Sequence, residues 1–459
     1  MKNILKFKYK LLALFLALIS ISCEDFIEVD LPDSQLSGDL IFNDIGTATA
    51  AVTDIYSKLS SNVLICGNYR GISILLGSYT DEVETVNMEL PDFNFFLNNI
   101  IASNDEISHI WNKSYNLIYA VNAIKEGLEN STTIDSNEKE PLLGELYFLR
   151  AFIHFQLTNL FGDIPYVTST DYKVNTTIEK LPITQVYDLV ISDLETAKFF
   201  IPAQNHPMQT RPGADAIRTL LARTYLYSKN WHLAAMEADE VINSGRLSWV
   251  NSIEEVFLKS SPGTIWQLMP QEEGLPTMEA QNFIFTLVPP PARAINDQLI
   301  EAFEPGDMRK ELWIGSISGN DKTWYYPFKY KQSEIEAVSQ EYSVIMRLEE
   351  LYLIRAEARL NLGDSYGAKN DINKIRSRAG LPETSANSEF EIKNAILQER
   401  RIEFFSEQGH RFFDLKRTGD IDAVLIPIKP GWKSHNILWP LPESELLLNP
   451  NLLPQNNGY

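Results

Sequence analysis

The sequence predicts a mainly α-helical protein, with tetratricopeptide-like helical hairpins that form a scaffold and one irregular, loop-rich insertion. The first observation is a pair of adjacent helical segments at 347–378, separated by a Gly-Asp break. The second is a similar pair at 214–228 and 231–243. The third is the stretch 251–344, which lies between these pairs and is rich in Pro, Gly and aromatic residues. We therefore expect one helical body with a looser insertion.

Helical spacing of apolar residues marks the elements that precede the insertion. The predicted helices lie at 47–59, 106–128, 139–160, 181–200, 214–228 and 231–243. Pro182 suits the first turn of the fourth of these helices, and Pro202 suits its end. Glycines interrupt the stretch 60–104, where we predict no regular structure. Within the insertion, the segments 264–268 and 282–288 resemble short β-strands.

The C-terminal hairpin shows the tetratricopeptide-like pattern most clearly. Gly363 and Asp364 end its first helix. Small side chains let two helices pack closely, so Ala356 and Ala358 are expected to approach Ala368 across the turn. The apolar or small residues that keep the helical period in the two helices are Leu351, Ile354, Ala358, Leu362, Ala368, Ile372 and Ile375.

The segment that follows this hairpin, ILQERRIEFFSEQGHRFFDLKR, mixes charged and aromatic residues densely. Charges this close to aromatic rings predict a half-buried network of salt bridges rather than a solvated helix face. The residues expected to form it are Glu399, Arg400, Arg401, Glu403, Phe404, Phe405, Arg411 and Asp414.

The N-terminus has the pattern of a secretory signal. Four lysines precede the apolar run 11–19, which is shorter than the roughly 20 residues that a membrane-spanning helix needs. Ser20, Ile21 and Ser22 then lead to Cys23. A small residue directly before a cysteine is what a lipoprotein signal peptidase needs, since it cleaves there and leaves a lipidated cysteine. We therefore predict a lipoprotein signal peptide at 1–22 and one mature domain at 23–459. An ordinary signal peptide and a membrane-anchoring helix are the alternatives.

Cysteine usage agrees with an exported chain that has no internal disulfide. The sequence contains two cysteines. If Cys23 carries lipid, Cys66 has no partner in the mature chain, and we expect it to be a small buried apolar residue.

Charge and motif content argue against nucleic-acid binding and catalysis. The formal net charge is −21, whereas phosphate binding needs clustered Lys and Arg. The six histidines show no metal-ligand spacing, and no GxSxG, Walker A or GxGxxG motif occurs. Glycosidases act through a pair of carboxylates, and Asp81 and Glu82 form such a pair in the sequence. Adjacent acids are nevertheless expected by chance in so acidic a chain. We expect no enzyme, no cofactor and no metal.

Aromatic residues with polar neighbours are the natural candidates for ligand binding, because aromatic faces stack on sugar rings and amides bind hydroxyls. Two sequence clusters have this character. The first consists of Tyr69, Arg70, Asp81, Phe93, Phe95, Phe96, Asn98 and Asn99, and the second of Trp313, Trp324, Tyr325, Tyr326 and Phe328. Trp111 and Tyr115 share a helical stripe and are expected to lie in the core instead.

Three blocks carry a family resemblance that spans nearly the whole mature chain. They are RAFIHFQLTNLFGDIPYV at 150–167, the segment 347–417, and the ending PLPESELLLNPNLLPQNNGY, in which Asn457 stands where a proline is usual. Together they resemble the SusD/RagB family of surface lipoproteins that capture nutrients. Glu24 and Asp25, next to Cys23, resemble the acidic signal that directs such lipoproteins to the outer face.

The resemblance implies a lipid-anchored outer-membrane protein that binds a glycan and closes as a lid over a TonB-dependent, SusC-like transporter. In glycan-binding relatives, ligand aromatics come from the same two general regions as the clusters above. Peptide capture, as in RagB-like members, is the alternative within the family. A secreted glycosidase and a purely structural lid are the alternatives outside these two binding functions.

Overall fold

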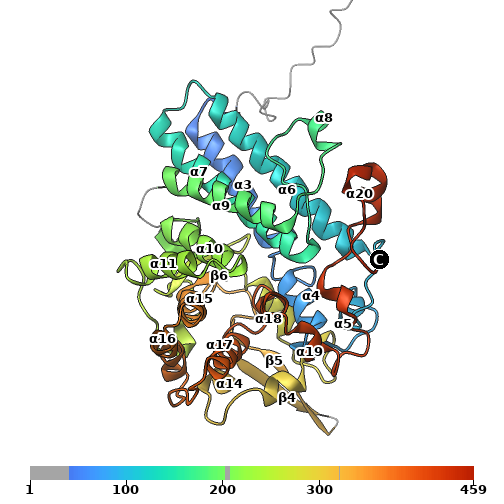
Figure 1. The fold of residues 1–459 in the computed structure, drawn as a ribbon, viewed down its shortest axis with the longest axis vertical. Helices are drawn as coiled ribbons and strands as arrows, with labels where there is room; N and C mark the ends of the chain where they lie inside the picture. The colour runs from blue at the N-terminus through green and yellow to red at the C-terminus, as the bar shows by residue number, and fades with distance from the viewer. Residues whose placement is uncertain (1–40, 202–206, 320) are drawn as a thin grey trace, which may run out of the picture.

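The computed structural model describes residues 41–201, 207–319 and 321–459 (Figure 1). The predicted signal peptide, Cys23, Glu24, Asp25 and Pro202 lie outside the described residues. Among the helices that are described, none is long and apolar enough to cross a membrane.

The described chain is mainly helical, as predicted, with short strands gathered in its second half. The α-helices are α3 (Ile45–Asn62), α4 (Ile72–Tyr79), α5 (Phe93–Phe96), α6 (Asp105–Asn130), α7 (Ser136–Phe161), α8 (Tyr172–Asn175), α9 (Ile183–Phe200), α10 (Ala214–Tyr227), α11 (Trp231–Ile242), α12 (Met278–Phe283), α13 (Asp297–Glu301), α14 (Met308–Leu312), α15 (Leu348–Asn361), α16 (Ser365–Arg378), α17 (Glu389–Glu403), α18 (His410–Thr418), α19 (Ile421–Leu425) and α20 (Glu443–Leu448). The 3-10 helices are η1 (Pro207–Gln209), η2 (Ile253–Glu255), η3 (Ser434–Ile437) and η4 (Pro450–Leu452). The strands are β1 (Val83–Thr85), β2 (Thr264–Leu268), β3 (Arg293–Ile295), β4 (Ile314–Gly319), β5 (Lys322–Pro327) and β6 (Ser343–Arg347).

Long helices form the scaffold in successive antiparallel pairs (Figure 1). Helices α3, α6, α7 and α9 pack together at one end of the molecule, and α10 with α11 and α15 with α16 form two hairpins in the middle. Both hairpins were predicted, and α11 packs on α15, so the two hairpins are stacked although the insertion separates them in sequence. Ala356 packs with Ala368, as expected, but Ala358 faces the main core on the other side of α15.

The helix α4 was missed by the sequence prediction. All of its residues, from Ile72 to Tyr79, are buried. A helix that is buried all round shows no amphipathic period, and this period is the signal on which the prediction relied. It ends directly before Asp81 and β1, so it positions part of the first predicted ligand cluster.

The insertion is more ordered than predicted. Its strands form two-stranded antiparallel sheets: β2 with β6, β4 with β5, and β3 with β1, which comes from the N-terminal half. The predicted strand at 264–268 is confirmed as β2. The predicted strand at 282–288 is wrong, because α12 extends to Phe283 and no strand follows before β3. A second, smaller core lies under the insertion, where Trp313 and Phe257 pack edge to face.

The predicted salt-bridge network exists, and its part around Glu403 is fully rather than half buried. Glu403 at the end of α17 binds Arg347 at 2.5 Å and Arg309 at 3.0 Å, and it also pairs with Arg378. Burial alone would raise the pKa of Glu403, but the three guanidinium groups lower it well below its ordinary value. Sequence showed the charges of this network. The sequence did not show how deeply these charges are buried. They are buried because Arg347, Arg309 and Arg378 reach Glu403 from three separate elements.

A second buried group of charges joins α4 to the C-terminal helices. The Asp81 carboxylate accepts hydrogen bonds from Arg401 and Arg411, each at 2.8 Å. Beside it, Glu82 is buried and its Oε1 has no hydrogen-bond partner. Burial, reinforced by the charge of Asp81, raises the pKa of Glu82 to about 8.

Replacing Glu403 with alanine is expected to lower the free energy of unfolding by about 3–5 kcal/mol, because three buried arginines lose their shared carboxylate. Urea denaturation followed by circular dichroism measures the change. Glu389→Ala, at the exposed start of the same helix, is the matched control and should cost less than about 1 kcal/mol. Equal effects of the two substitutions would contradict the role given to the network.

Glu82 is expected to make the protein less stable as the pH rises from about 5 to 8. Its pKa is 4.5 as an ordinary carboxyl and about 8 in the folded protein, so in this window the folded state binds more protons than the unfolded state. Glu82→Gln removes the titrating group and should reduce this loss of stability. Urea denaturation at pH 5 and at pH 8 tests it, and an unchanged difference between the two pH values in the variant would refute it.

Candidate functional site

The structure divides the predicted ligand residues into buried and surface groups. Phe95, Trp313, Asp81 and Asn98 are buried, so their prediction as ligand contacts is wrong. The Phe95 ring packs edge-on against Trp439 with centroids 5.2 Å apart, and Trp313 Nε1 donates to the Ile253 carbonyl at 3.2 Å. The Asn98 side chain donates to the Tyr79 carbonyl at 2.9 Å. These side chains complete the core and have no face open to a ligand.

Tyr69 and Arg70 lie on a separate surface, at the N-terminal end of α6. Arg70 binds Glu106 at 2.9 Å, and its guanidinium lies over the Tyr69 ring, 5.3 Å from the centroid. Burial is the main cause that raises the pKa of Glu106, and Arg70 partly offsets it. This pair is half-exposed and oriented by its own local contacts.

The short helix α5 carries the surviving part of the first cluster. Phe93 and Phe96 are half-buried, and their ring centroids lie 6.1 Å apart. The ammonium of Lys429 lies 4.2 Å from the centre of the Phe96 ring. Asn99 beyond them is exposed. The α5 rings therefore have part of their surface free, and a cation already contacts one of them.

The β4–β5 hairpin carries the second cluster. In a strand, alternate side chains point to opposite faces, so Trp324 and Tyr326 share one face of β5 and Tyr325 points to the other. Tyr325 is partly buried and packs against the second core. The Tyr326 ring lies over Gly315 on the paired strand, where any larger residue would collide with it. The same ring contacts Phe285 and Phe328.

The structure brings α5 and the β4–β5 hairpin together through the β1–β3 sheet. On one side, Asp92 at the start of α5 accepts a hydrogen bond from Thr85 of β1 at 3.1 Å and pairs with Arg293 of β3 at 3.3 Å. On the other, β3 packs against β5, and Lys322 of β5 binds Glu84 of β1 at 3.3 Å. Segments more than two hundred residues apart thus form one region.

We define the hairpin surface as Glu84, Lys322, Trp324 and Tyr326. The Lys322 ammonium lies 3.7 Å from the centre of the Trp324 ring, and the buried Trp324 Nε1 has no hydrogen-bond partner. Glu84 and Lys322 were not predicted as site residues, because a single charged residue in a strand forms no recognisable sequence motif. Only the packing of the strands places the two side chains together. An aromatic ring, an ammonium and a carboxylate at this spacing offer one stacking surface, one donor and one acceptor to a polar ligand.

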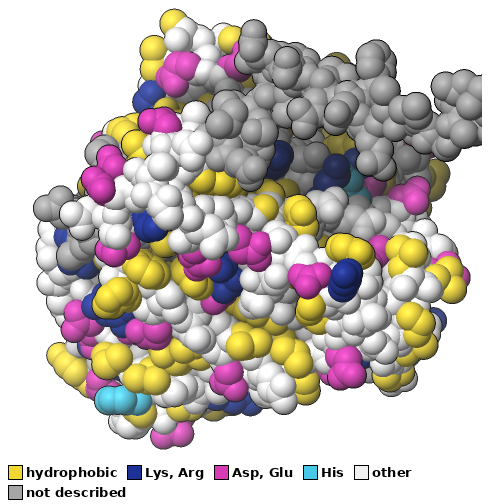
Figure 2. All heavy atoms as spheres, turned by 90° about the horizontal axis from the view of Figure 1, so that it is seen from above, with side chains coloured by type: hydrophobic (Ala, Val, Ile, Leu, Met, Phe, Trp, Pro, Cys, Tyr) yellow, Lys and Arg dark blue, Asp and Glu magenta, His cyan; other side chains and the backbone are white. Residues whose placement is uncertain are grey.

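Nothing in the described part of the chain resembles a metal site, since no group of three or more His, Cys, Asp or Glu residues is placed to hold an ion. Cys66 is buried and unpaired, as predicted, and burial is the main cause that raises its pKa to about 12. On the face drawn in Figure 2, acidic side chains are spread among basic and hydrophobic ones instead of forming one patch.

Comparisons with known proteins agree with this reading of the fold. A family model described as "Starch-binding associating with outer membrane" matches residues 41–226, and the model of the SusD family matches residues 308–459. The SusD-like protein P25 of Formosa agariphila is 24% identical over 97% of this chain and 98% of its own length.

Solved structures show the same fold. A SusD superfamily protein from Bacteroides vulgatus superposes with a TM-score of 0.80 at 21% identity, covering 91% of this chain and 99% of that chain. A laminarin-binding SusD-like protein superposes with a TM-score of 0.73 at 21% identity, covering 90% of this chain and 99% of that chain. The two family models cover most of the chain between them, and the fold agrees over its length, so this protein belongs to the SusD/RagB family.

Proposed function

We propose that this protein is a cell-surface lipoprotein that captures a glycan at the hairpin surface and delivers it to a TonB-dependent, SusC-like outer-membrane transporter. The observation that carries the proposal is the convergence of β1 and β5, which joins the two sequence regions that we selected for ligand binding. Relatives described as laminarin-binding and as carbohydrate-binding support a sugar ligand.

Trp324 is the residue that we expect to stack on the sugar. Lys322 now covers one face of its ring, but this lysine side chain is 41% exposed and has room to move aside. Lys322 and Glu84 then lie beside the ring, where they bind sugar hydroxyls. Aromatic contacts contribute about 0.5–1.5 kcal/mol each beyond the buried area. A small surface of this kind supports weak binding, which suits capture followed by release.

We propose binding without catalysis. Asp81 and Glu82 form the acid pair that came closest to a glycosidase pattern, and both are buried. Asp81 is neutralised between two arginines, and Glu82 is only 1% exposed. The carboxylates of a glycosidase must flank the scissile bond, which these two side chains cannot do.

Membrane attachment through Cys23 is part of the proposal. The first 22 residues have the signal pattern described above, and the lipid chains of a bacterial lipoprotein would hold the protein at the membrane.

Cys23→Ala is expected to abolish incorporation of labelled palmitate, because it removes the side chain that carries the lipid. Labelling of cells that express the full chain, followed by immunoprecipitation, measures the incorporation. Cys66→Ala is the matched control and should be labelled like the unchanged protein. Labelling of the Cys23 variant at the level of the unchanged protein would exclude lipidation at this residue.

Trp324→Ala is expected to weaken glycan binding by about tenfold, because it removes the principal stacking ring. Affinity electrophoresis of the full chain in gels that contain laminarin, xyloglucan, starch or pectin measures retardation. Phe390→Ala, whose ring is 72% exposed on α17 far from the hairpin in sequence, is the control. If the unchanged protein is retarded and the Trp324 variant is retarded equally, the hairpin surface is not the binding site.

A further inference from the structure

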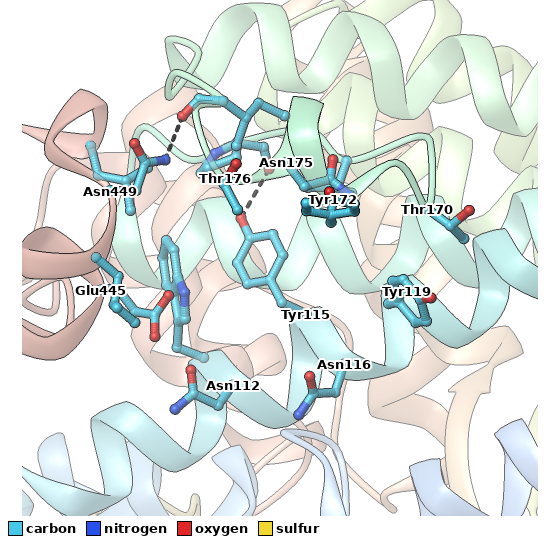
Figure 3. Close-up of a pocket in the computed structure, with 16 residues that line it drawn as sticks. Asn112, Tyr115, Asn116, Tyr119, Thr170, Tyr172, Asn175, Thr176, Glu445 and Asn449 are labelled. Atoms are coloured by element: carbon cyan, nitrogen blue, oxygen red, sulfur yellow. Dashed lines mark hydrogen bonds between the residues drawn. The ribbon is translucent and has the colours of Figure 1, made fainter. Parts of the chain in front are cut away.

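A groove of about 490 Å³ lies outside both predicted ligand clusters (Figure 3). One wall is the middle of α6, the second is the segment 165–178 with the short helix α8, and the third is the C-terminal segment with α20 and η4. None of its lining residues belongs to the hairpin surface. Its volume falls within the range of about 300–1,000 Å³ that is typical of ligand sites.

The α6 wall presents an aromatic stripe. Trp111, Tyr115 and Tyr119 follow one another at intervals of four residues, which places them on one side of the helix over about 12 Å. Trp111 is buried at the base, with its ring centroid 4.7 Å from that of Tyr115. Tyr119 is 52% exposed, and Tyr172, which is 69% exposed, lies across the groove from it (Figure 3).

Free amide groups accompany this stripe. Asn112 and Asn116 line the groove, are exposed, and make no hydrogen bond to the described part of the chain. They too are four residues apart and lie next to Trp111 and Tyr115 in the sequence. An amide offers two donors and one acceptor, which is the capacity that vicinal hydroxyl groups require.

Other polar groups hold the walls in place instead of facing the ligand. Tyr115 Oη donates to the Pro165 carbonyl at 2.9 Å, and Asn449 Nδ2 donates to the Ile178 carbonyl at 2.8 Å (Figure 3). These two bonds tie the segment 165–178 to α6 and to the C-terminal segment, respectively. The groove is therefore formed before any ligand arrives.

The charge of the groove excludes an anionic ligand. No Lys or Arg is found among the described residues that line it, and its one ionisable acid is Glu445. Burial raises the pKa of the Glu445 carboxyl, and a hydrogen bond from Trp111 partly offsets this. A carboxylate or sulfate on the ligand would find no cationic partner here and would face the side chain of Glu445.

We propose that this groove is a second carbohydrate site, separate from the hairpin surface, and that it binds an uncharged oligosaccharide. Tyr119 and Tyr172 stack against sugar rings, and Trp111 and Tyr115 form the floor beneath them. Asn112 and Asn116 bind the hydroxyl groups at the edges of these rings. The length of the aromatic stripe suits a short oligosaccharide better than a single sugar. This inference does not depend on ligand binding at Trp324.

The test uses the full chain in detergent micelles and two variants. The groove variant combines Tyr119→Ala with Asn116→Ala, two exposed positions whose side chains make no hydrogen bond to the described chain, so the fold is retained. Tyr366→Ala, 77% exposed on α16, is the matched control. Isothermal titration measures binding of laminarihexaose, cellohexaose, maltohexaose, xylohexaose, mannohexaose and hexagalacturonic acid to all three, and again in a Trp324→Ala background.

We expect at least one neutral hexasaccharide to bind about tenfold more weakly to the groove variant than to the Tyr366 control. We expect the same loss in the Trp324→Ala background, which separates this site from the hairpin surface. The proposal is overturned if no neutral hexasaccharide distinguishes the groove variant from the control, whether or not it binds. It is also overturned if hexagalacturonic acid is the only ligand whose binding depends on the groove.

Discussion

The buried charge network around Glu403 is the interaction on which the rest of the structure depends. It joins Arg347 at the end of β6, Arg378 at the end of α16 and Arg309 on α14 to one carboxylate at the end of α17. The helical scaffold and the insertion therefore meet at this carboxylate. Without it, three guanidinium groups would lie in the core with no shared counter-charge, a state that costs far more than the pairs themselves contribute.

This network also positions the β4–β5 hairpin. Arg309 stands shortly before β4, and Lys329 stands just after β5, where its ammonium donates to the carbonyls of Glu403 at 2.8 Å and Phe405 at 2.9 Å. Both ends of the hairpin are thus fixed to the same part of α17 and the turn that follows it. A binding surface on a short two-stranded sheet gains a defined orientation from this anchoring, since an isolated hairpin is marginally stable.

The two proposed carbohydrate surfaces have different physical characters. The hairpin surface is small and charged, and a lysine covers one face of its ring. The α6 groove is concave and has no Lys or Arg among its described lining residues. Its walls are held together by hydrogen bonds from Tyr115 and Asn449 to backbone carbonyls of the segment 165–178. One surface suits adaptable contact with a polymer, whereas the other suits a short stretch of neutral sugars in a preformed site.

The sequence by itself determined the helical scaffold, both hairpins and the family, because these depend on local periodicity and on blocks of contiguous residues. Its charge pattern also predicted a network at 399–414. Tertiary structure alone decided which aromatic residues are available. Phe95 and Trp313 looked like ligand contacts and lie in the core. Trp111 and Tyr115 were predicted to belong to the core and do pack there, but they also form the floor of a groove.

A spacing of four between Trp111, Tyr115 and Tyr119, with asparagines following the first two, was the one signal that pointed to the groove. The same spacing also describes a helix packed in a core, so it does not distinguish the two cases. The distinction depends on what covers the helix. Here the cover comes from the segments 165–178 and 443–452, and their approach to α6 is set by long-range contacts that no local pattern encodes.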